Sequence, residues 1–396
     1  MRNDPVSVGL VLLALPAALA VAGIGSYLLG LSAAALFAPR TAAPAAHRRR
    51  FAVLIPAHDE ASLIERVLHA LRAQTYPKER FDVFVVADNC GDETAAIAAR
   101  AGAIVHERRD DLLRAKGHAL RWLLERVRAR GPYDAYVVFD ADSVMSADFL
   151  ERMNARLEAG SRVLQAHYRV LNPRASSVSA LREAAFASLH YLRPMGRAAL
   201  GLSCGLKGNG MCFDAATLDR HGWASVGLAE DVELHLALVR AGERVDFVPE
   251  ATVWADMPTT LAAAKSQNVR WEQGRIGAAR SDVGGLLREG LARRSAVEVD
   301  AAVEQLILPV SVGLAAGAAA TLLAFLGGST VLAAVALFGT AAIGVHVVAG
   351  LVAVRAPART YLALAAAPAY IAWKVLLYAR ALAAPADVGW VRTRRP

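Results

Sequence analysis

The feature that most constrains this chain is a long apolar run near its N-terminus. Residues 6–39 contain no charged side chain, and a helix needs about 20 apolar residues to cross a bilayer. A secretory signal peptide has an apolar core of only about 7–15 residues, with positive charge ahead of it. Here the basic cluster Arg48-Arg49-Arg50 follows the run. The pattern therefore favours a retained membrane anchor over residues 1–40.

Three more apolar runs lie near the C-terminus, within a predicted membrane region over residues 304–384. Residues 306–326 and 331–354 are each long enough to span a bilayer. Residues 361–382 contain Lys374 and Arg380, and charged side chains are expensive within a span. We therefore expect this last run to form an interfacial or re-entrant helix.

Basic residues give the expected orientation. Cytoplasmic flanks of spans are rich in Lys and Arg, and Arg355 and Arg359 follow the run 331–354. With the basic cluster after the first run, they place the central domain in the cytoplasm. We expect an integral protein of a bacterial inner membrane, with residues 385–396 as a basic cytoplasmic tail.

The composition narrows the possible partners. Hydrophobic residues make up 55% of the chain, and the formal net charge is +8. Positive charge can attract nucleic acid, anionic lipid or anionic substrate, but many of the basic residues here flank the apolar runs. No stretch alternates basic and aromatic residues as a groove for single-stranded nucleic acid does. We therefore expect the lipid bilayer, and no nucleic acid, as a partner.

The three cysteines, Cys90, Cys204 and Cys212, fit no disulfide framework and no CxxC metal site. We expect them to be unpaired thiols.

Between the apolar ends, strand-like runs alternate with helical patterns. We expect strands over 52–55, 83–86 and 136–139, and helices over 61–74, 93–101 and 117–130. This alternation is typical of an α/β domain with a mostly parallel sheet and helices on both faces. Ligands of such sheets bind beyond the carboxyl ends of the strands. Polar clusters stand at those ends: His58-Asp59-Glu60, Asp88-Asn89 and Asp140-Ala141-Asp142.

Asp140 and Asp142 directly follow an apolar strand. Two carboxylates separated by one residue project to the same side of an extended segment. Hard oxygen ligands of this kind bind Mg²⁺ or Mn²⁺, which in turn bridge phosphate oxygens. The same pattern also occurs in solvated turns and helix caps, so the pair alone leaves both interpretations open. The preceding strand favours the metal site.

Other acids allow two interpretations each. Asp88 could accept a hydrogen bond from a base or ribose, whereas Asp92 fits the cap of the following helix. Glu230 and Asp231 precede an apolar-periodic helix, where acids complement the helix dipole. Asp231 could equally act as a general base toward an acceptor hydroxyl.

The segment Gln267-Asn268-Val269-Arg270-Trp271 lies in a predicted helix over 259–279. Gln267, Arg270 and Trp271 share one side of that helix. An arginine can neutralise a leaving diphosphate, and a tryptophan can stack on a sugar. The alternative is an amphipathic interfacial helix with Trp271 at headgroup level, within an interfacial region over residues 256–300.

Two smaller features complete the set. Lys116 could reach a phosphate, or it could be a solvated surface lysine. The glycines of residues 205–210 permit close approach of the backbone to a ligand, or form a plain turn.

Taken in order, these clusters resemble the family 2 glycosyltransferases. They match the membrane-bound branch that includes cellulose, chitin, hyaluronan and poly-N-acetylglucosamine synthases. The resemblance covers about residues 51–275. It implies a nucleotide-diphospho-sugar transferase domain of the GT-A type, with a Rossmann-like mixed sheet, over residues 51–255. Membrane and interfacial helices would flank this domain.

The resemblance also implies a role for each matching residue. Asp231 would be the catalytic base, with Glu230 beside it, and Asp140 and Asp142 would hold Mg²⁺ or Mn²⁺. The remaining residues fall into a donor-binding group and a group near the acceptor and the diphosphate. The donor group is Pro56, His58, Glu60, Asp88, Asn89, Lys116 and Asp140. The acceptor and diphosphate group is Gly208, Asn209, Gln267, Arg270 and Trp271.

The implied activity is that of an inverting, metal-dependent hexosyltransferase. It would move a sugar from a UDP-sugar to a glycan acceptor in cell-surface or exopolysaccharide synthesis. Polysaccharide-export proteins or a second copy of the chain would be its partners. The chain departs from the large synthases in having too few spans for an obvious polysaccharide channel. This leaves an alternative open, namely single addition to a membrane lipid. A non-enzymatic scaffold and a transporter fit less well, because the acids are intact and no paired broken helices are evident.

Overall fold

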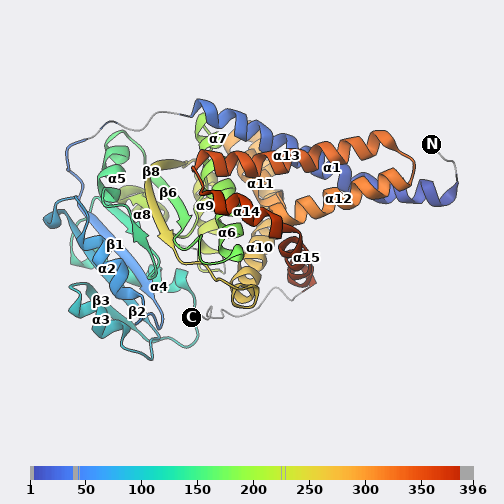
Figure 1. Cartoon of the computed structure of the whole chain (residues 1–396). Coiled ribbons are helices and arrows are strands. Elements are labelled where there is room, and N and C mark those ends of the chain that lie inside the picture. Colours follow the sequence, from blue (N-terminus) through green and yellow to red (C-terminus); the bar gives the residue numbers. More distant parts are fainter. Residues whose placement is uncertain (1–3, 39–42, 44, 224, 228, 384–396) are drawn as a thin grey trace.

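A computed structural model describes residues 4–38, 43, 45–223, 225–227 and 229–383 of the chain. A globular domain built around one sheet stands at one end of the molecule, and the helices α1, α12 and α13 extend from it as a bundle (Figure 1). The predicted tail over 385–396 lies outside the described residues. So do Arg40 and the first three residues of the predicted anchor.

The sheet is mixed and has eight strands in the order β3-β2-β1-β4-β7-β6-β8-β5. β1 pairs parallel with β2 and β4, and β2 pairs parallel with β3. β7 runs antiparallel to β4 and β6, β8 pairs parallel with β6, and β5 is antiparallel to β8. The strands are β1 Phe51–Ala57, β2 Phe81–Asp88, β3 Ile104–Arg108, β4 Ala135–Val138, β5 Val144–Met145, β6 Val163–Val170, β7 Met211–Asp214 and β8 Val245–Ala255.

Helices cover both faces of the sheet and continue into the bundle. The α-helices are α1 Pro5–Ala34, α2 Ile64–Arg72, α3 Thr94–Arg100, α4 Lys116–Arg130, α5 Phe149–Glu158, α6 Ser177–Phe186, α7 Arg193–Ala199, α8 Ala215–His221, α9 Glu230–Arg240, α10 Leu261–Arg293, α11 Ala296–Leu306, α12 Val310–Leu326, α13 Thr330–Ala353, α14 Ala358–Ala363 and α15 Ala367–Ala383. A π-helical turn, η3 Ala187–Leu192, joins α6 to α7, and 3₁₀ turns are η1 Ala35–Phe37, η2 Lys78–Arg80 and η4 Leu364–Ala366.

The alternation of β1 shows why the sheet is buried on both faces. Phe51, Val53 and Ile55 pack in a core with residues of α2 and α5. Ala52 and Leu54 belong to the opposite core, with residues of α4 and α9. Because successive side chains of a strand point to opposite faces, an uninterrupted apolar strand fits only between two helical layers. The three predicted strands are confirmed as β1, β2 and β4 and the three predicted helices as α2, α3 and α4, with boundaries shifted by a few residues, whereas β3 was not predicted.

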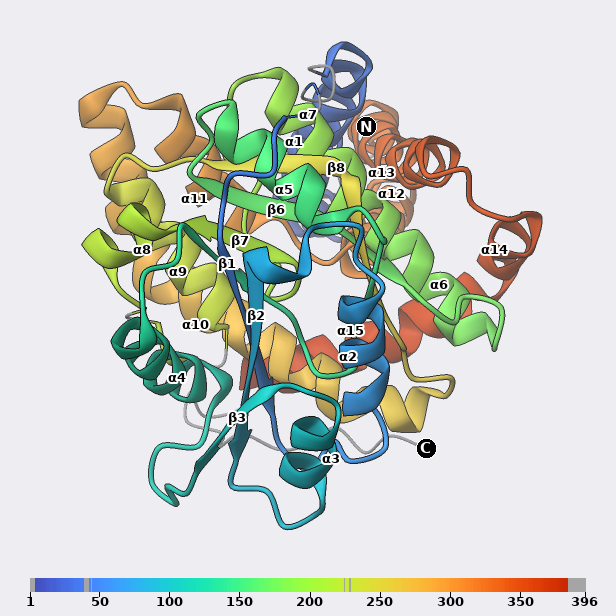
Figure 2. The same ribbon diagram turned by 90° about the vertical axis from the view of Figure 1, so that its left-hand side faces the viewer.

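The membrane segments agree with the sequence in part. Within the described residues, Pro5–Phe37, Thr330–Ala353 and Ala358–Ala383 are long and apolar enough to cross a membrane. α12 meets this test only together with α11, to which it is bent by 71°. α1, α12 and α13 lie side by side, whereas α15 crosses the end of their bundle beside α10 (Figures 1 and 2). The last run, expected to be interfacial or re-entrant because of its two charges, is instead long and apolar enough to cross a membrane, although it lies across the bundle.

The charge within α15 is paired. Lys374 is buried, with its Nζ 2.8 Å from Glu272 Oε1 and 2.7 Å from Asn268 Oδ1, both on α10. A charge inside an apolar helix is tolerated when an opposite charge satisfies it. The sequence indicated that a charge at Lys374 would be unfavourable within an apolar helix. It did not indicate the partner, because Glu272 is about a hundred residues away.

The basic cluster before β1 is also engaged by the domain. Arg49 Nε lies 2.6 Å from Glu158 Oε1, and Arg50 Nη2 lies 2.8 Å from Asp82 Oδ2. These two arginines therefore fix the entry to β1, in addition to any contribution to membrane orientation.

A second buried polar group joins the domain to the bundle. Arg197 of α7 is only 2% exposed. Its Nε lies 2.7 Å from Asp300 Oδ2, and its Nη2 donates to Tyr27 Oη of α1 at 2.6 Å and to Glu304 of α11. One guanidinium therefore holds three elements that are far apart in sequence.

We expect Arg197→Met to destabilise the folded chain by about 3–5 kcal/mol, because Asp300 and Glu304 would stay buried without their partner. The measurement is the melting temperature of the full chain in detergent. The control is Arg121→Met. It removes an exposed ion pair with Glu125, of a kind that contributes about 0–1 kcal/mol. Equal melting temperatures for the two variants would contradict the prediction.

Candidate active site

A single cavity of about 570 Å³ connects the carboxyl ends of β1, β2 and β4 with the membrane helices. Nearly all predicted site residues line it, although they come from segments more than 200 residues apart. The lining members are Pro56, His58, Glu60, Asp88, Asn89, Lys116, Asp140, Asp142, Gly208, Glu230, Asp231, Gln267, Arg270 and Trp271. Asn209 lies just behind this surface.

Lys116, at the first turn of α4, is the centre of the polar cluster. Its Nζ lies 2.6 Å from Asp140 Oδ1 and 3.5 Å from Glu230 Oε1, and it donates to the carbonyl oxygen of Gly208. Burial alone would lower the pKa of Lys116, but Asp140 and Glu230 raise it above its usual range. The side chain is therefore a fixed cation, and the alternative of a solvated surface lysine is wrong.

Glu230 and Asp231 begin α9 and face this cation. Burial raises the pKa of Glu230 to about 7, against the opposing effect of Lys116. Burial also raises the pKa of Asp231, again opposed by Lys116. A carboxylate whose pKa lies near the working pH can accept a proton in a reaction. The pair is therefore suited to proton transfer as well as to complementing the helix dipole.

The loop before β7 approaches Asp231 closely. Gly208 has φ +77°, and a Cβ at this position would lie 3.4 Å from Asp231 Oδ2. Glycine adopts this left-handed conformation without the cost that other residues incur. The glycine-rich segment is therefore part of the site rather than a distant turn.

Asn209 positions Asp140. It is fully buried, and its Oδ1 accepts hydrogen bonds from the Asp140 N–H at 3.2 Å and from Ser143 Oγ at 3.1 Å. Its carbonyl oxygen accepts from Gln165 Nε2 at 2.9 Å. These contacts give Asn209 a supporting role behind the acid, where a role at the acceptor had been expected.

At the other end of the cavity, Asp88 is held by an arginine that the sequence did not single out. Arg108 Nη1 lies 2.6 Å from Asp88 Oδ1, and the Arg108 side chain is 4% exposed. Asp88 and Arg108 are register partners at the ends of β2 and β3. Burial raises the pKa of Asp88, and the hydrogen bond from Arg108 opposes that shift. The position at a strand end, shared with Asp88 and Asp140, was the available signal for Arg108.

His58 and Asn89 shape the same end. His58 Nδ1 lies 2.7 Å from the carbonyl oxygen of Asp88. Asn89 adopts φ +51°, and its Oδ1 accepts from the Asp110 N–H at 2.8 Å. Asn89 thus fixes the turn after β2, which keeps the Asp88 carboxylate at the cavity.

The α10 residues form the middle of the cavity. Trp271 has its ring centroid 6.4 Å from that of Phe186, and the Arg182 guanidinium lies 5.2 Å from the Trp271 ring. Gln267 Oε1 is buried with no hydrogen-bond partner among the described residues. Gln267 and Trp271 therefore offer one polar atom and one aromatic surface to a ligand.

The donor groups that line the cavity show whether the site suits a divalent cation. Asp140, Asp142, Glu230 and Asp231 all line the cavity, and Lys116 is the cation that pairs with two of them. Carboxylate oxygens are the ligands that Mg²⁺ and Mn²⁺ prefer, and the local excess of negative charge favours a further cation. The residues fit such an ion.

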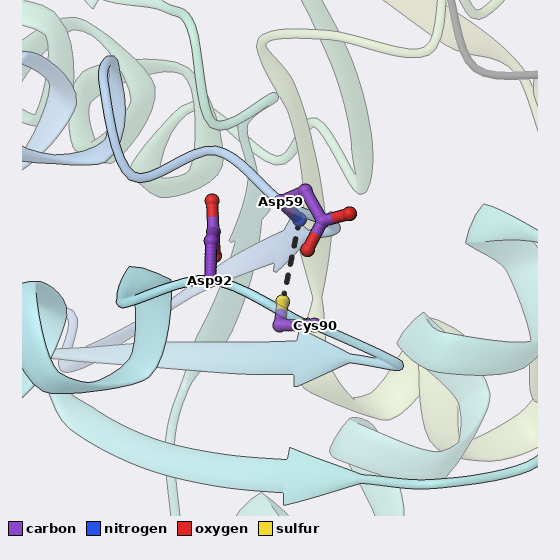
Figure 3. Close-up of side chains that lie close together, drawn as sticks. All are labelled: Asp59, Cys90 and Asp92. Atoms are coloured by element: carbon purple, nitrogen blue, oxygen red, sulfur yellow. Dashed lines mark hydrogen bonds between the residues drawn. The ribbon is translucent and has the colours of Figure 1, made fainter.

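A second group of potential ligands, Asp59, Cys90 and Asp92, fits a hard cation less well (Figure 3). Asp59 Oδ1 accepts from the Gly91 N–H at 2.7 Å, and Asp92 Oδ2 accepts from the Ala61 N–H at 3.1 Å. Burial raises the pKa of the Cys90 thiol, which keeps it protonated. These contacts join the loops after β1 and β2.

Asp92 was expected to cap the helix after β2. The N-cap position of α3 is Glu93, which makes no side-chain capping bond. Asp92 Oδ1 instead accepts from the Thr94 N–H at 3.0 Å, so Asp92 supplies the capping bond from one residue earlier.

Comparison with known proteins points to one family. The family described as "Glycosyltransferase like family 2" matches residues 47–274. A probable glycosyltransferase, YdaM of Bacillus subtilis, is 26% identical over 238 residues, 57% of this chain and 55% of that protein. The poly-beta-1,6-N-acetyl-D-glucosamine synthase of Staphylococcus aureus is 24% identical over 230 residues, 56% of this chain and 53% of that protein. The alignments thus span about half the length of these curated relatives.

Among solved structures, the chain resembles a mannosyltransferase from Pyrobaculum calidifontis in complex with GDP-Man and Mn²⁺. The identity is 19% and the TM-score is 0.52, over 87% of this chain and 98% of that chain. This likeness supports the expected GT-A fold.

The acidic cluster predicts a pH effect on stability. Because the folded chain binds the Glu230 proton more tightly than the unfolded chain, Glu230 costs stability as the pH rises from about 4 to about 7. The cost is roughly 3 kcal/mol at most. Glu230→Gln avoids it, so the melting temperature of the variant relative to the native chain should rise between pH 5 and pH 8. The control is Glu65→Gln at an exposed site, for which the difference should stay flat. A falling difference for Glu230→Gln would contradict the assignment.

Proposed function

Because this chain belongs to the family "Glycosyltransferase like family 2", we propose that it transfers a sugar from a nucleotide-sugar donor to a hydroxyl acceptor at a membrane. The observation that carries the proposal is the convergence of Lys116, Asp140, Glu230 and Asp231 in one cavity. Asp88 lines the same cavity and is paired with Arg108. The cavity thus suits a nucleoside as well as a diphosphate and a proton transfer.

The donor nucleotide, which we propose to be a uridine diphosphate, lies along the strand ends. The Asp88 carboxylate, oriented by Arg108, accepts hydrogen bonds from the base or ribose. Pro56, His58, Glu60 and Asn89 form the surrounding wall. Lys116 is placed to neutralise a phosphate oxygen, since its ammonium already lies among carboxylates in the same cavity. Arg270 of α10 is far from Lys116 in the sequence but lines the same cavity, where it supplies a second cation.

A divalent cation completes the diphosphate site. Asp140 and Asp142 would hold Mg²⁺ or Mn²⁺, and Asn209 would keep Asp140 in position. When bound, the ion neutralises negative charge on the departing nucleoside diphosphate.

The acceptor hydroxyl attacks the anomeric carbon while the bond from that carbon to the diphosphate oxygen breaks. Asp231 takes the hydroxyl proton. Glu230, which is buried with Asp231 beside Lys116, adjusts the pKa of Asp231. A single displacement inverts the anomeric configuration, so an α-linked donor gives a β-linked product. Trp271 offers its ring to the sugar or the acceptor.

The candidate membrane helices support a proposal for the acceptor and the location. We propose an integral membrane enzyme with its catalytic domain in the cytoplasm, on the inner membrane of a bacterium. A glycan acceptor in cell-surface or exopolysaccharide synthesis was the first expectation, and a membrane lipid was the alternative. The cavity continues to α12 and α15, which favours the lipid.

The proposed chemistry is tested by incubating the purified full chain with a panel of nucleotide-sugars and Mn²⁺ in the presence of membrane lipid. The readout is released nucleoside diphosphate. We expect Asp231→Asn to reduce transfer by about 10²–10⁴-fold, the usual contribution of a general base. Its affinity for UDP should stay within about twofold. Near-native turnover in this variant would exclude Asp231 as the base.

The metal assignment has its own test in UDP binding. Asp140→Ala should remove the part of the UDP affinity that depends on Mn²⁺, because Asp140 and Asp142 would hold the ion that offsets the negative charge of the diphosphate. Calorimetry with and without Mn²⁺ measures this difference. The control is Asp92→Ala, outside the cavity, which should keep the Mn²⁺ effect. An Asp140→Ala variant with a native Mn²⁺ effect would remove Asp140 from the metal site.

A further inference from the structure

We infer that the acceptor is a membrane lipid with a free hydroxyl, which reaches Asp231 from the bilayer through the membrane end of the cavity. The inference rests on the proposed glycosyl transfer and names the class of its acceptor.

The first support is the continuity of the cavity. The lining that starts at Asp231 continues without interruption to the apolar side chains of four membrane-region segments. These are Leu308, Val310 and Leu314 before and in α12, Val347 in α13, Leu364 in η4 and Ile371 in α15. All six side chains are half-buried. Apolar lining of this kind favours an alkyl chain, because leaving such surface in water costs about 25 cal/mol per Å².

The second support is the polar part of the lining. Gln267, His190 and Arg193 line the same cavity as Asp231, and each has a buried polar atom, Gln267 Oε1, His190 Nδ1 and Arg193 Nε, with no hydrogen-bond partner among the described residues. Polar side chains beside an apolar lining suit an amphiphile, whose headgroup would lie among them while its alkyl part would lie among the apolar residues.

A carboxylate at the reacting end favours a hydroxyl over a phosphate as the attacking group, because an ionised phosphate oxygen needs no base to remove a proton. A hydroxyl needs a base, which Asp231 provides. In this step the lipid oxygen bonds to the anomeric carbon, the bond to the diphosphate breaks and Asp231 takes the proton.

Packing of the bundle argues against a growing polysaccharide. A Cβ on Gly25 of α1 would lie 2.6 Å from the carbonyl oxygen of Gly339 in α13. A Cβ on Gly317 of α12 would lie 2.1 Å from Thr340 Oγ1. α13 thus packs closely against α1 at Gly339 and against α12 at Thr340, and a chain of sugars has no room at these two points.

The test uses the full chain in nanodiscs of bacterial polar lipids supplemented with dioleoylglycerol and ceramide. Radiolabelled UDP-glucose and UDP-N-acetylglucosamine are the donors, and butanol-extractable label is the readout. We expect one sugar per labelled lipid. Leu314→Trp, which narrows the membrane end, should lower lipid labelling at least tenfold. Leu322→Trp, on the same helix at an exposed position outside the cavity lining, should stay within twofold.

Folding and donor binding are followed separately by UDP calorimetry, so that a misfolded Leu314→Trp variant is recognised. Ile371→Trp on α15, with Leu376→Trp as its exposed control, provides a second independent pair. Three results would each overturn the lipid acceptor. The first is UDP release without label in lipid, and the second is a polymer ladder on an added glucan or chitin oligosaccharide. The third is an equal effect in both members of each pair of variants. Absence of any UDP release would instead count against the glycosyl transfer itself.

Discussion

The ammonium of Lys116 is the interaction on which the rest of the site depends. It joins the end of β4 through Asp140, the start of α9 through Glu230 and the loop before β7 through the Gly208 carbonyl oxygen. Without a cation at this point, the carboxylates would repel one another in a buried place. The sheet can therefore bring several acids to one edge only because α4 begins with a lysine there. Burial and Lys116 act in opposite directions on Glu230 and leave its pKa near 7. Its protonation therefore changes when a cation or a phosphate enters.

Buried ion pairs also join the catalytic domain to the membrane helices. Arg197 connects α7 with α1 and α11, and Lys374 connects α15 with α10. Ion pairs of this kind contribute less to net stability than apolar packing would, but breaking one is costly. They define the angle at which each helix meets the domain. The position of α15 across the bundle, rather than along it, follows from this pairing with Glu272.

Much of the fold was predictable, because short apolar runs and helical patterns are local signals. The strands β1, β2 and β4, the N-terminal anchor, the GT-A fold and the family were all predicted from such patterns and from the order of the acids, whereas β3 was missed. The antiparallel half of the sheet was not predicted, since β6, β7 and β8 pair across tens of residues. Arg108 was missed although it stands at a strand end, because that position does not single out an arginine; strand register brings it opposite Asp88. The place of Asn209 behind Asp140 likewise depends on contacts between distant segments of the chain.

The position of the cavity explains why one chain combines these parts. A nucleotide-sugar is anionic and water-soluble, whereas the residues at the opposite end of the cavity, such as Leu314 and Ile371, are apolar. A solvent-exposed cleft would leave that apolar end in water, and a site within the bilayer would exclude the donor. A site at the boundary meets both requirements. Trp271 lines this cavity, with Gln267 one turn before it on α10. The same helix carries Asn268 and Glu272, which hold α15 through Lys374, so α10 connects the polar lining of the cavity with an apolar helix.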